Sequence, residues 1–255
     1  MSTYKEPVRV LMREMIEALG LRPGEMFTKD KALDWFKQKY PLIKEGTISA
    51  HLIRHSTNNK NRLHHSSLQR DGSDDLFFQT APASFRLYDK LTDPTPIRQG
   101  DEPATSAPTS ASAEEGTEYG SPPTASEFAY EQDLRDYLSK NLHLIEPGLR
   151  LYNEDDVNGV EFPVGGRFID ILAIDKAGGY VVIELKVSRG HEKTIGQLLR
   201  YMGWIEKNHA DAGQAVRGVI VAKEATDDLR LACLFARSVS LFEYDLSVSL
   251  RPIHS

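Results

Sequence analysis

The sequence predicts two domains of different class: a small α+β domain over residues 1–91 and an α/β domain over residues 125–255. In the first, three runs with apolar residues at helical spacing precede two short alternating segments. In the second, helices and strands alternate, which is typical of a mixed sheet flanked by helices. Residues 92–124 lie between them and contain almost no large apolar side chain. A chain of 255 residues is long enough for two such domains.

Three helices are expected at the start of the first domain. Residues 8–19 carry apolar side chains at helical spacing, and Gly20 is expected to end this helix. Thr28 is expected to cap a second helix, and Thr47 a third over residues 48–55.

Two short strands, 76–79 and 84–88, are expected after a polar loop over residues 56–75. Three helices followed by a hairpin resemble a winged helix-turn-helix domain, in which the hairpin is the wing. The resemblance rests on the order of the elements, and it implies a DNA-binding domain.

Basic and amide side chains gather on the third expected helix and in the loop after it. Such side chains hydrogen-bond phosphates and base edges. Because Ile48 and Leu52 are expected to point inward, the basic residues of the helix are expected to face outward. A solvated helix end is the alternative, and a histidine metal site is disfavoured because no cysteine or acidic cluster accompanies the histidines. The residues expected to contact DNA here are His51, Arg54, His55, Lys60 and Arg62.

The segment 92–124 is predicted to be a flexible tether, rich in Pro, Ser, Thr, Ala and acidic residues. Such a tether would let the two domains move independently. The net charge of −6 is unevenly divided: residues 1–91 hold 15 Lys and Arg against 11 Asp and Glu, and residues 125–255 hold 15 against 20. The basic excess is therefore confined to the first domain.

Cysteine content and hydropathy exclude several classes of protein. The single cysteine, Cys233, excludes an intrachain disulfide and a cysteine-based zinc site. No run of eighteen apolar residues occurs, and the N-terminal residues lack the apolar core of a signal peptide. We therefore expect a cytoplasmic protein with no membrane partner.

The second domain is expected to alternate helices and strands around a central pair of strands. In chain order we expect a helix from Ser126, an irregular strand within 152–164, strands 168–174 and 180–187, a helix over 191–207, a strand over 217–222, a helix from Thr226 to 237 and a strand over 239–244.

Charged side chains interrupt the two central strands. The turn at 176–179 contains Gly-Gly, which favours a tight hairpin. Glu184 and Lys186 then share one face of their strand, and Asp170 comes from the partner strand. Two carboxylates beside an ammonium group suit a divalent metal and a polarised water that attacks a phosphodiester. The alternative is an exposed hairpin whose Glu/Lys pair contributes little energy.

This D…ExK pattern resembles the PD-(D/E)xK nuclease superfamily. More narrowly, residues 125–250 are similar to the nuclease domain of NucS/EndoMS-type endonucleases. The resemblance implies a restriction-endonuclease-like α/β fold. The matching stretches are YEQDL at 130–134, LIEPGL at 144–149, FIDIL at 168–172, VIELK at 182–186 and GQLLRY at 196–201.

The resemblance also implies roles for individual residues. Asp170, Glu184 and the carbonyl of Leu185 would bind Mg²⁺ or Mn²⁺. Lys186 would orient or activate the attacking water and help to neutralise charge that develops on the phosphate.

Three further residues are expected near this site. Glu131 would supply a metal ligand through water, or alternatively would be a helix N-terminal acid that interacts with the helix dipole. Gln197 and Tyr201, four residues apart on one helix, would lie over the site and hold a phosphate or a metal-bound water. Tyr201 is thus also a candidate DNA contact.

Two departures from the family bear on function. NucS/EndoMS proteins carry a β-rich N-terminal domain, which a winged-helix-like domain replaces here, and no clear sliding-clamp-binding peptide follows Tyr244. The leading expectation is therefore a Mg²⁺-dependent endonuclease of restriction or modification-dependent type that cuts double-stranded DNA without a small-molecule cofactor. A homodimer is one possible assembly. The alternatives are a NucS-like nuclease for mismatched or branched DNA, a DNA-binding regulator with an inert nuclease fold, and an RNA substrate.

Overall fold

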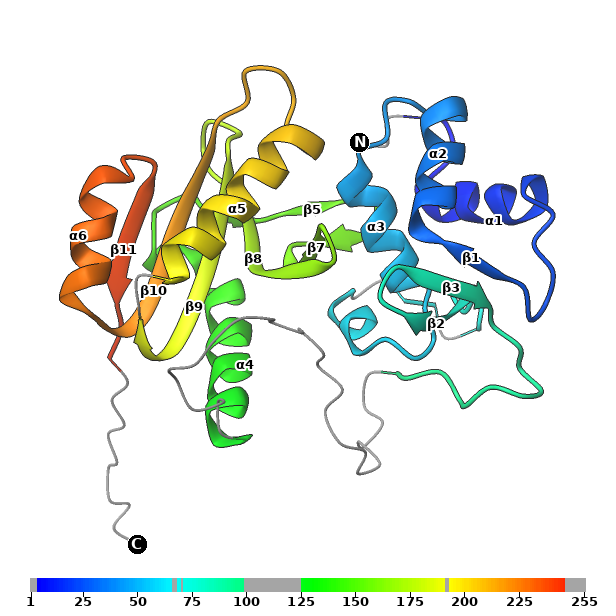
Figure 1. Ribbon diagram of the computed structural model, residues 1–255, viewed down its shortest axis with the longest axis horizontal. Helices are drawn as coiled ribbons and strands as arrows, with labels where there is room; N and C mark the ends of the chain where they lie inside the picture. The colour runs from blue at the N-terminus through cyan, green and yellow to red at the C-terminus, as the bar shows by residue number, and fades with distance from the viewer. Residues whose placement is uncertain (1–3, 66–67, 70, 99–124, 191–192, 246–255) are drawn as a thin grey trace, which may run out of the picture.

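The computed structural model describes residues 4–65, 68, 69, 71–98, 125–190 and 193–245, and the structural findings concern these residues. The N-terminal and C-terminal parts lie side by side, with α3 and β7 where they meet (Figure 1). Across the described ranges, none of the helices has both the length and the apolar character that crossing a membrane requires.

The first domain contains the three expected helices and the expected hairpin. Its elements are α1 (Val8–Ala18), β1 (Met26–Thr28), α2 (Lys29–Lys39), α3 (Glu45–Arg54), the 3₁₀ helix η1 (Lys60–His64), β2 (Phe77–Ala81) and β3 (Ser84–Leu87). The short strand β1 was not expected. It pairs with β3, with Phe27 opposite Phe85, and makes a three-stranded antiparallel sheet in the order β1-β3-β2. Both phenylalanines belong to the core of this domain.

The predicted caps of α2 and α3 have different outcomes. Thr28 caps α2, because its hydroxyl accepts a hydrogen bond from the amide of Lys31 at 3.2 Å. Thr47 does not cap α3. That helix begins two residues earlier, at Glu45, and Thr47 is buried inside it.

The second domain is built on a mixed sheet, as the sequence predicts. Its strand order is β11-β10-β9-β8-β4, and β7 also pairs with β8. Strands β9, β10 and β11 are parallel, whereas β8 is antiparallel to all of its neighbours. The elements are α4 (Ala125–Lys140), η2 (Leu142–Leu144), β4 (Arg150–Leu151), β5 (Asn153–Glu154), β6 (Val157–Asn158), β7 (Val160–Val164), β8 (Arg167–Ile174), β9 (Tyr180–Gly190), α5 (Lys193–Asn208), β10 (Val216–Ala225), α6 (Asp227–Phe235) and β11 (Val239–Glu243).

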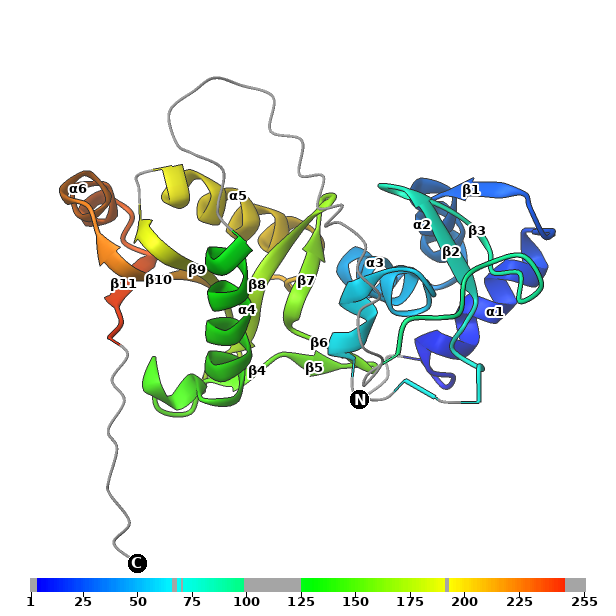
Figure 2. The same ribbon diagram turned by 90° about the horizontal axis from the view of Figure 1, so that it is seen from below.

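The central hairpin β8–β9 has the tight turn that the sequence predicts. Gly178 adopts φ 87°, and a carboxylate oxygen of Asp175 accepts hydrogen bonds from the amides of Ala177 and Gly179 at 3.0 and 2.9 Å. The sheet is buried on both faces. Leu134 of α4 packs with Ile183 on one face, and Leu198 of α5 packs with Val182 on the other. Figure 2 shows α4 and α5 on either side of β9.

Helix α3 lies between the two domains and is buried along almost its whole length. Leu52 belongs to the core of the first domain, whereas Ala50 packs into the core of the second with Phe162. Gly46 lets the backbone of α3 lie close to His209 of the second domain. A Cβ atom built at Gly46 would lie only 2.7 Å from Nδ1 of His209. The expectation of independently moving domains is therefore not met in this structure. The apolar residues of α3 cover two faces of the helix, and each face needs a partner.

Polar contacts also join the domains. Lys44 forms an ion pair with Asp211, and Arg9 lies 3.8 Å from Asp156.

The described part of the expected tether packs on the first domain. Asp93 pairs with Arg86, Arg98 pairs with Asp75, and the amide of Ile97 donates to the carbonyl of Thr57 at 2.9 Å. The first domain thus extends to residue 98, and not to 91 as expected. The rest of the predicted tether, 99–124, lies outside the described residues.

Candidate active site

The candidate site lies where strands β8 and β9 stop pairing. Their backbone ladder ends at the pair Ile171 and Ile183. Asp170 lies one residue beyond this end, and its Oδ2 accepts a hydrogen bond from the amide of Leu185 at 2.8 Å. The amide of Leu185 thus bonds to the side chain of Asp170 instead of to a backbone carbonyl of β8. This hydrogen bond fixes the carboxylate of Asp170 against β9.

Glu184 is the most enclosed member of the site, with a relative exposure of 2%. Its Oε1 accepts hydrogen bonds from Nζ of Lys186 at 2.8 Å and from Nε2 of Gln197 at 2.7 Å. The same amide group of Gln197 lies 3.1 Å from the hydroxyl of Tyr201. Glu184 Oε2 is buried and has no hydrogen-bond partner among the described residues. The structure therefore brings together the residues expected from β8, β9 and α5, and it leaves one buried acceptor unsatisfied.

Burial and mutual repulsion raise the proton affinity of these carboxylates. Burial, assisted by the charge of Asp170, raises the pKa of Glu184 to about 8. Burial also raises the pKa of Asp170. Burial alone would lower the pKa of Lys186, but the charges of Glu184 and Asp170 outweigh it and raise that pKa overall. When both carboxylates are ionised, their charge exceeds what a single ammonium group neutralises, and a bound cation would favour these ionised forms.

Glu131 approaches this group from α4. Burial raises its pKa, and the charge of Asp170 raises it further. Because α4 begins at Ala125, Glu131 lies beyond the first turn, where the helix dipole has little effect. The structure thus favours a place at the site over the helix-dipole alternative.

The donor set fits a hard divalent cation that keeps part of its water shell. The unsatisfied oxygen of Glu184 and the carboxylate of Asp170 are the oxygen ligands that such ions prefer. Within the described residues, no three His, Cys, Asp or Glu side chains lie close enough to form a complete metal cage. Mg²⁺ is commonly bound by one or two carboxylates plus water and substrate oxygens, so this partial set suits it.

Two residues beside the site were not among those predicted. Arg135 on α4 donates a hydrogen bond to Oε1 of Glu161 on β7. Arg135 lies one helical turn after Glu131, so the sequence does indicate that the two side chains share a face of α4. Glu161 has a φ of +46°, a strained value for a residue with a side chain that costs about 1–3 kcal/mol. Sequence alone gives no signal for such a backbone.

The predicted DNA-reading face of α3 is not exposed. His51, Arg54 and His55 are buried, so the expectation that they face outward is wrong, and the predicted DNA contact Arg62 of η1 is buried as well. The loop after η1 folds back and neutralises the two arginines. Arg54 makes a bidentate pair with Asp74 at 2.9 and 3.1 Å, and Arg62 pairs with Asp75.

The buried histidines of α3 are neutral. Burial lowers the pKa of His51, and it lowers that of His55 to about 3. Nε2 of His51 donates to the carbonyl of Asp155 in the second domain at 2.7 Å. These imidazoles therefore bind the protein itself and add no positive charge near neutral pH. Lys60 is exposed and stays a predicted DNA contact. Tyr201 is buried at the site beside Gln197.

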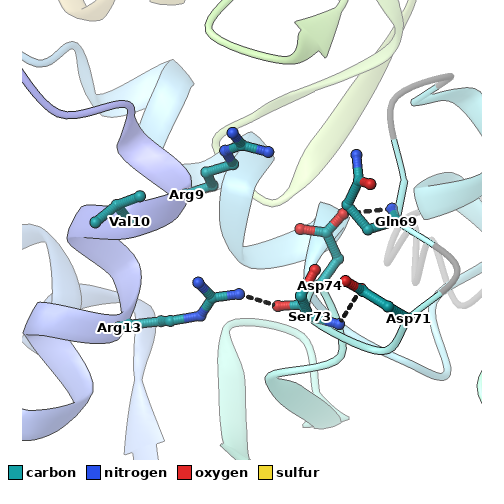
Figure 3. A pocket seen from close by; sticks show the side chains of 7 residues that line it. All are labelled: Arg9, Val10, Arg13, Gln69, Asp71, Ser73 and Asp74. Carbon is teal, nitrogen blue, oxygen red and sulfur yellow. Dashed lines mark hydrogen bonds between the residues drawn. The ribbon is translucent and has the colours of Figure 1, made fainter.

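A separate pocket of about 280 Å³ lies in the first domain, between α1 and the loop before β2. Figure 3 shows Arg9 and Arg13 projecting from α1 toward this loop, where Arg13 donates to the carbonyl of Ser73. Opposite them, Asp74 is already neutralised by Arg54. The pocket contains none of the carboxylates of the candidate active site.

The geometry defines a class of protein. Carboxylates from two adjacent strands, a lysine two residues after the second carboxylate and a glutamine from the covering helix form an arrangement that resembles the site of PD-(D/E)xK nucleases. Residues 130–238 match the family model described as the endonuclease NucS C-terminal domain. The second domain is a NucS-like nuclease domain. Residues 7–87 match a family described only as a domain of unknown function, DUF7669.

Two curated relatives are similar to part of the chain. Endonuclease NucS of Methanopyrus kandleri is 33% identical over 103 residues, which cover 40% of this chain and 36% of the relative. Endonuclease NucS of Pyrococcus furiosus is 30% identical over 98 residues, which cover 38% and 33%. The chain thus spans about a third of the length of the curated relatives it matches.

Solved structures give weaker matches. A structure described as an EndoMS–dsDNA complex is 22% identical with a TM-score of 0.39, over 52% of this chain and 51% of that one. A repair endonuclease from Pyrococcus abyssi is 22% identical with a TM-score of 0.37, over 51% of this chain and 50% of that one.

Proposed function

We propose that this protein is a divalent-metal-dependent endonuclease that hydrolyses phosphodiester bonds in DNA. The observation that carries the proposal is the buried, unsatisfied Oε2 of Glu184 beside Asp170 and Lys186, in a NucS-like nuclease domain. Asp170 and Glu184, with the carbonyl of Leu185 and with Glu131 through water, would hold Mg²⁺ or Mn²⁺. Bound there, the cation would polarise the phosphodiester and lower the pKa of a coordinated water.

The residues of the chain prepare the reaction. Glu184 holds Lys186, whose ammonium group would orient the attacking water and stabilise negative charge on the phosphate. Gln197 fixes Glu184 from α5, and Tyr201 in turn contacts Gln197. These contacts restrain the carboxylate before substrate binds, which reduces the reorganisation needed at the moment of reaction. An inert regulator would not need this constellation.

The burial of α3 bears on the choice of substrate. A winged-helix-like domain that reads bases would use an exposed helix in the major groove. Here α3 is buried against the second domain, and its arginine is neutralised by Asp74. We therefore propose that the enzyme selects DNA by its structure, as a repair-type nuclease would, rather than by a base sequence read by α3. A restriction-type or modification-dependent role is the second candidate.

One cleavage experiment separates these functions. The full chain is incubated with Mn²⁺ and four duplexes of one sequence: perfect, mismatched, branched, and perfect but isolated from a methylating host. A single-stranded RNA of that sequence is the fifth substrate, and Asp170→Asn is the matched control. We expect cleavage of the mismatched or branched DNA by the unmodified protein only. Site-specific cleavage of a perfect duplex would favour the restriction-type role, and DNA binding without cleavage would favour an inert regulator.

A further inference from the structure

The side chain of Glu161 joins the candidate active site to the first domain. Its Oε1 accepts a hydrogen bond from Arg135 of the active-site helix α4. Its Oε2 lies 3.3 Å from Nε2 of His64, in η1 of the first domain. Asn158, three residues earlier, donates to the carbonyl of His64 and so holds η1 beside β7. Both oxygens of one carboxylate are therefore used, each by a different domain.

The backbone of Glu161 is strained at a position next to the site. On β7, Val160 pairs with Ile171 and Phe162 pairs with Ile169, which places Glu161 across from Asp170. Its φ of +46° departs from strand geometry, although both of its neighbours are buried in the strand. Strained residues cluster where the surrounding structure holds a side chain in a particular place for function.

The partner that Glu161 holds is a buried cation beside the catalytic carboxylates. Arg135 is only 8% exposed, and its Nε has no hydrogen-bond partner in the described part of the chain. Burial raises the pKa of Glu131 and of Asp170, and the charge of Arg135 acts in the opposite direction on both. A guanidinium released from Glu161 would be attracted to these two carboxylates, on which its charge already acts. There it would compete with a divalent cation.

We propose that Glu161 is a positioning residue that keeps Arg135 away from the metal-binding carboxylates, and that its contact with His64 makes this restraint depend on docking of the first domain. The inference rests on the proposed function, and it assigns to the first domain a role in the metal affinity of the nuclease site. When the first domain is docked, His64 holds one oxygen of Glu161 while the other oxygen binds Arg135. Loss of the His64 contact would therefore loosen the restraint on Arg135.

The test is a mutant cycle with Mn²⁺ binding to the full chain, measured by calorimetry without DNA. Glu161→Gln should weaken Mn²⁺ binding by roughly fivefold or more, because a released positive charge repels the cation. Arg135→Met should suppress this effect, so that the double variant binds Mn²⁺ within about twofold of Arg135→Met alone. His64→Ala, which leaves β7 untouched, should weaken binding in the same direction, and Arg135→Met should again suppress the loss.

Lys44→Ala is the matched control, because the exposed ion pair of Lys44 with Asp211 contributes little to docking and does not contact Glu161, so Mn²⁺ affinity should stay unchanged. Thermal unfolding checks that each variant is folded, and His64→Ala carries the test if Glu161→Gln is not. Unchanged affinity in both Glu161→Gln and His64→Ala would overturn the inference. So would a double variant as weak as Glu161→Gln, which would make Glu161 itself a metal ligand. Asp170→Ala separates the two proposals: if it leaves Mn²⁺ binding intact, the metal site itself is wrong.

Discussion

Asp170 accepts a hydrogen bond from the backbone amide of Leu185 at 2.8 Å, just beyond the last paired residues of β8 and β9. The carboxylate therefore lies where the pairing of the two central strands ends. The backbone of β9 orients it at the same time. A position with both roles tolerates few substitutions. Asparagine is the most conservative one, because its carbonyl oxygen can still accept this hydrogen bond.

Asp170→Asn and Lys186→Ala should each lower the cleavage rate by about 10²–10³ or more, because the first weakens the metal site and the second removes a positive charge that stabilises the transition state. DNA affinity should change little, since it depends mainly on phosphate contacts elsewhere. Plasmid nicking and a gel-shift titration measure the two effects side by side. Cleavage by Asp170→Asn at the unmodified rate would contradict the assignment of the site.

Cleavage should require Mg²⁺ or Mn²⁺, and Ca²⁺ should bind without supporting it. Calcium accepts oxygen ligands but tolerates looser geometry and is a poor activator of water. A rise in the unfolding temperature with Ca²⁺ would report binding independently of activity. Full cleavage in excess chelator would rule out the metal-dependent mechanism.

The contribution of Glu184 to the stability of the metal-free protein should fall as the pH rises from 4.5 to about 8. Burial and then the charge of Asp170 raise the pKa of Glu184 from 4.5 to about 8 on folding. A carboxyl with a raised pKa stabilises the fold most below its unfolded pKa, and this contribution is lost as the pH passes the folded value. The unfolding temperature of Glu184→Gln should therefore fall less, or rise more, with increasing pH over this range than that of the unmodified protein. Equal slopes for the two proteins would contradict the raised pKa.

Arg54→Ala should destabilise the first domain by about 3–5 kcal/mol, because it leaves the buried Asp74 without its bidentate partner. Urea unfolding measures the loss. Lys60→Ala is the control at an exposed cation, and the free energy of unfolding of this variant should change by less than about 0.5 kcal/mol. If Lys60 contacts a phosphate, the same variant should bind DNA more weakly. The slope of log binding constant against log salt concentration should then flatten by about one unit. An Arg54→Ala protein of normal stability would contradict the buried pair.

Gly46→Ala should destabilise the protein by about 1–3 kcal/mol, because the new methyl group would collide with His209 and Phe162 of the second domain. Gly203→Ala is the matched control on α5, where no other atom lies within 4 Å of the added carbon. That change should stabilise the helix by up to about 1 kcal/mol. Thermal unfolding of both variants decides the matter. A gain in stability at both positions would mean that the domains are not in close contact.

The sequence predicts the second domain well because its signals are local. The spacing of Glu184 and Lys186 on one strand and of Gln197 and Tyr201 on one helix determines which side chains share a face. The turn at Asp175 orients the two strands, and the structure brings the four side chains together with Asp170.

The surroundings of α3 could not be predicted in the same way. Its arginine and histidines suggest a surface that binds DNA, but Asp74, 20 positions from Arg54, and the carbonyl of Asp155, 104 positions from His51, satisfy Arg54 and His51 inside the protein. Charge in a sequence does not reveal whether its partner is a ligand or another segment of the same chain. The position of Glu161 was missed for a related reason, because its positive φ depends on tertiary packing.

The shared burial of α3 has a consequence for how the chain is made. Lys44 and Asp211 meet across the interface although they lie 167 positions apart. At 5–20 residues per second, a ribosome needs roughly 10 to 30 s to synthesise the intervening chain. During that interval the outward face of α3, with Gly46 and Ala50, has emerged while the nuclease domain that will cover it is incomplete. The nascent protein thus exposes this face until the nuclease domain is complete, and slower translation would lengthen that period.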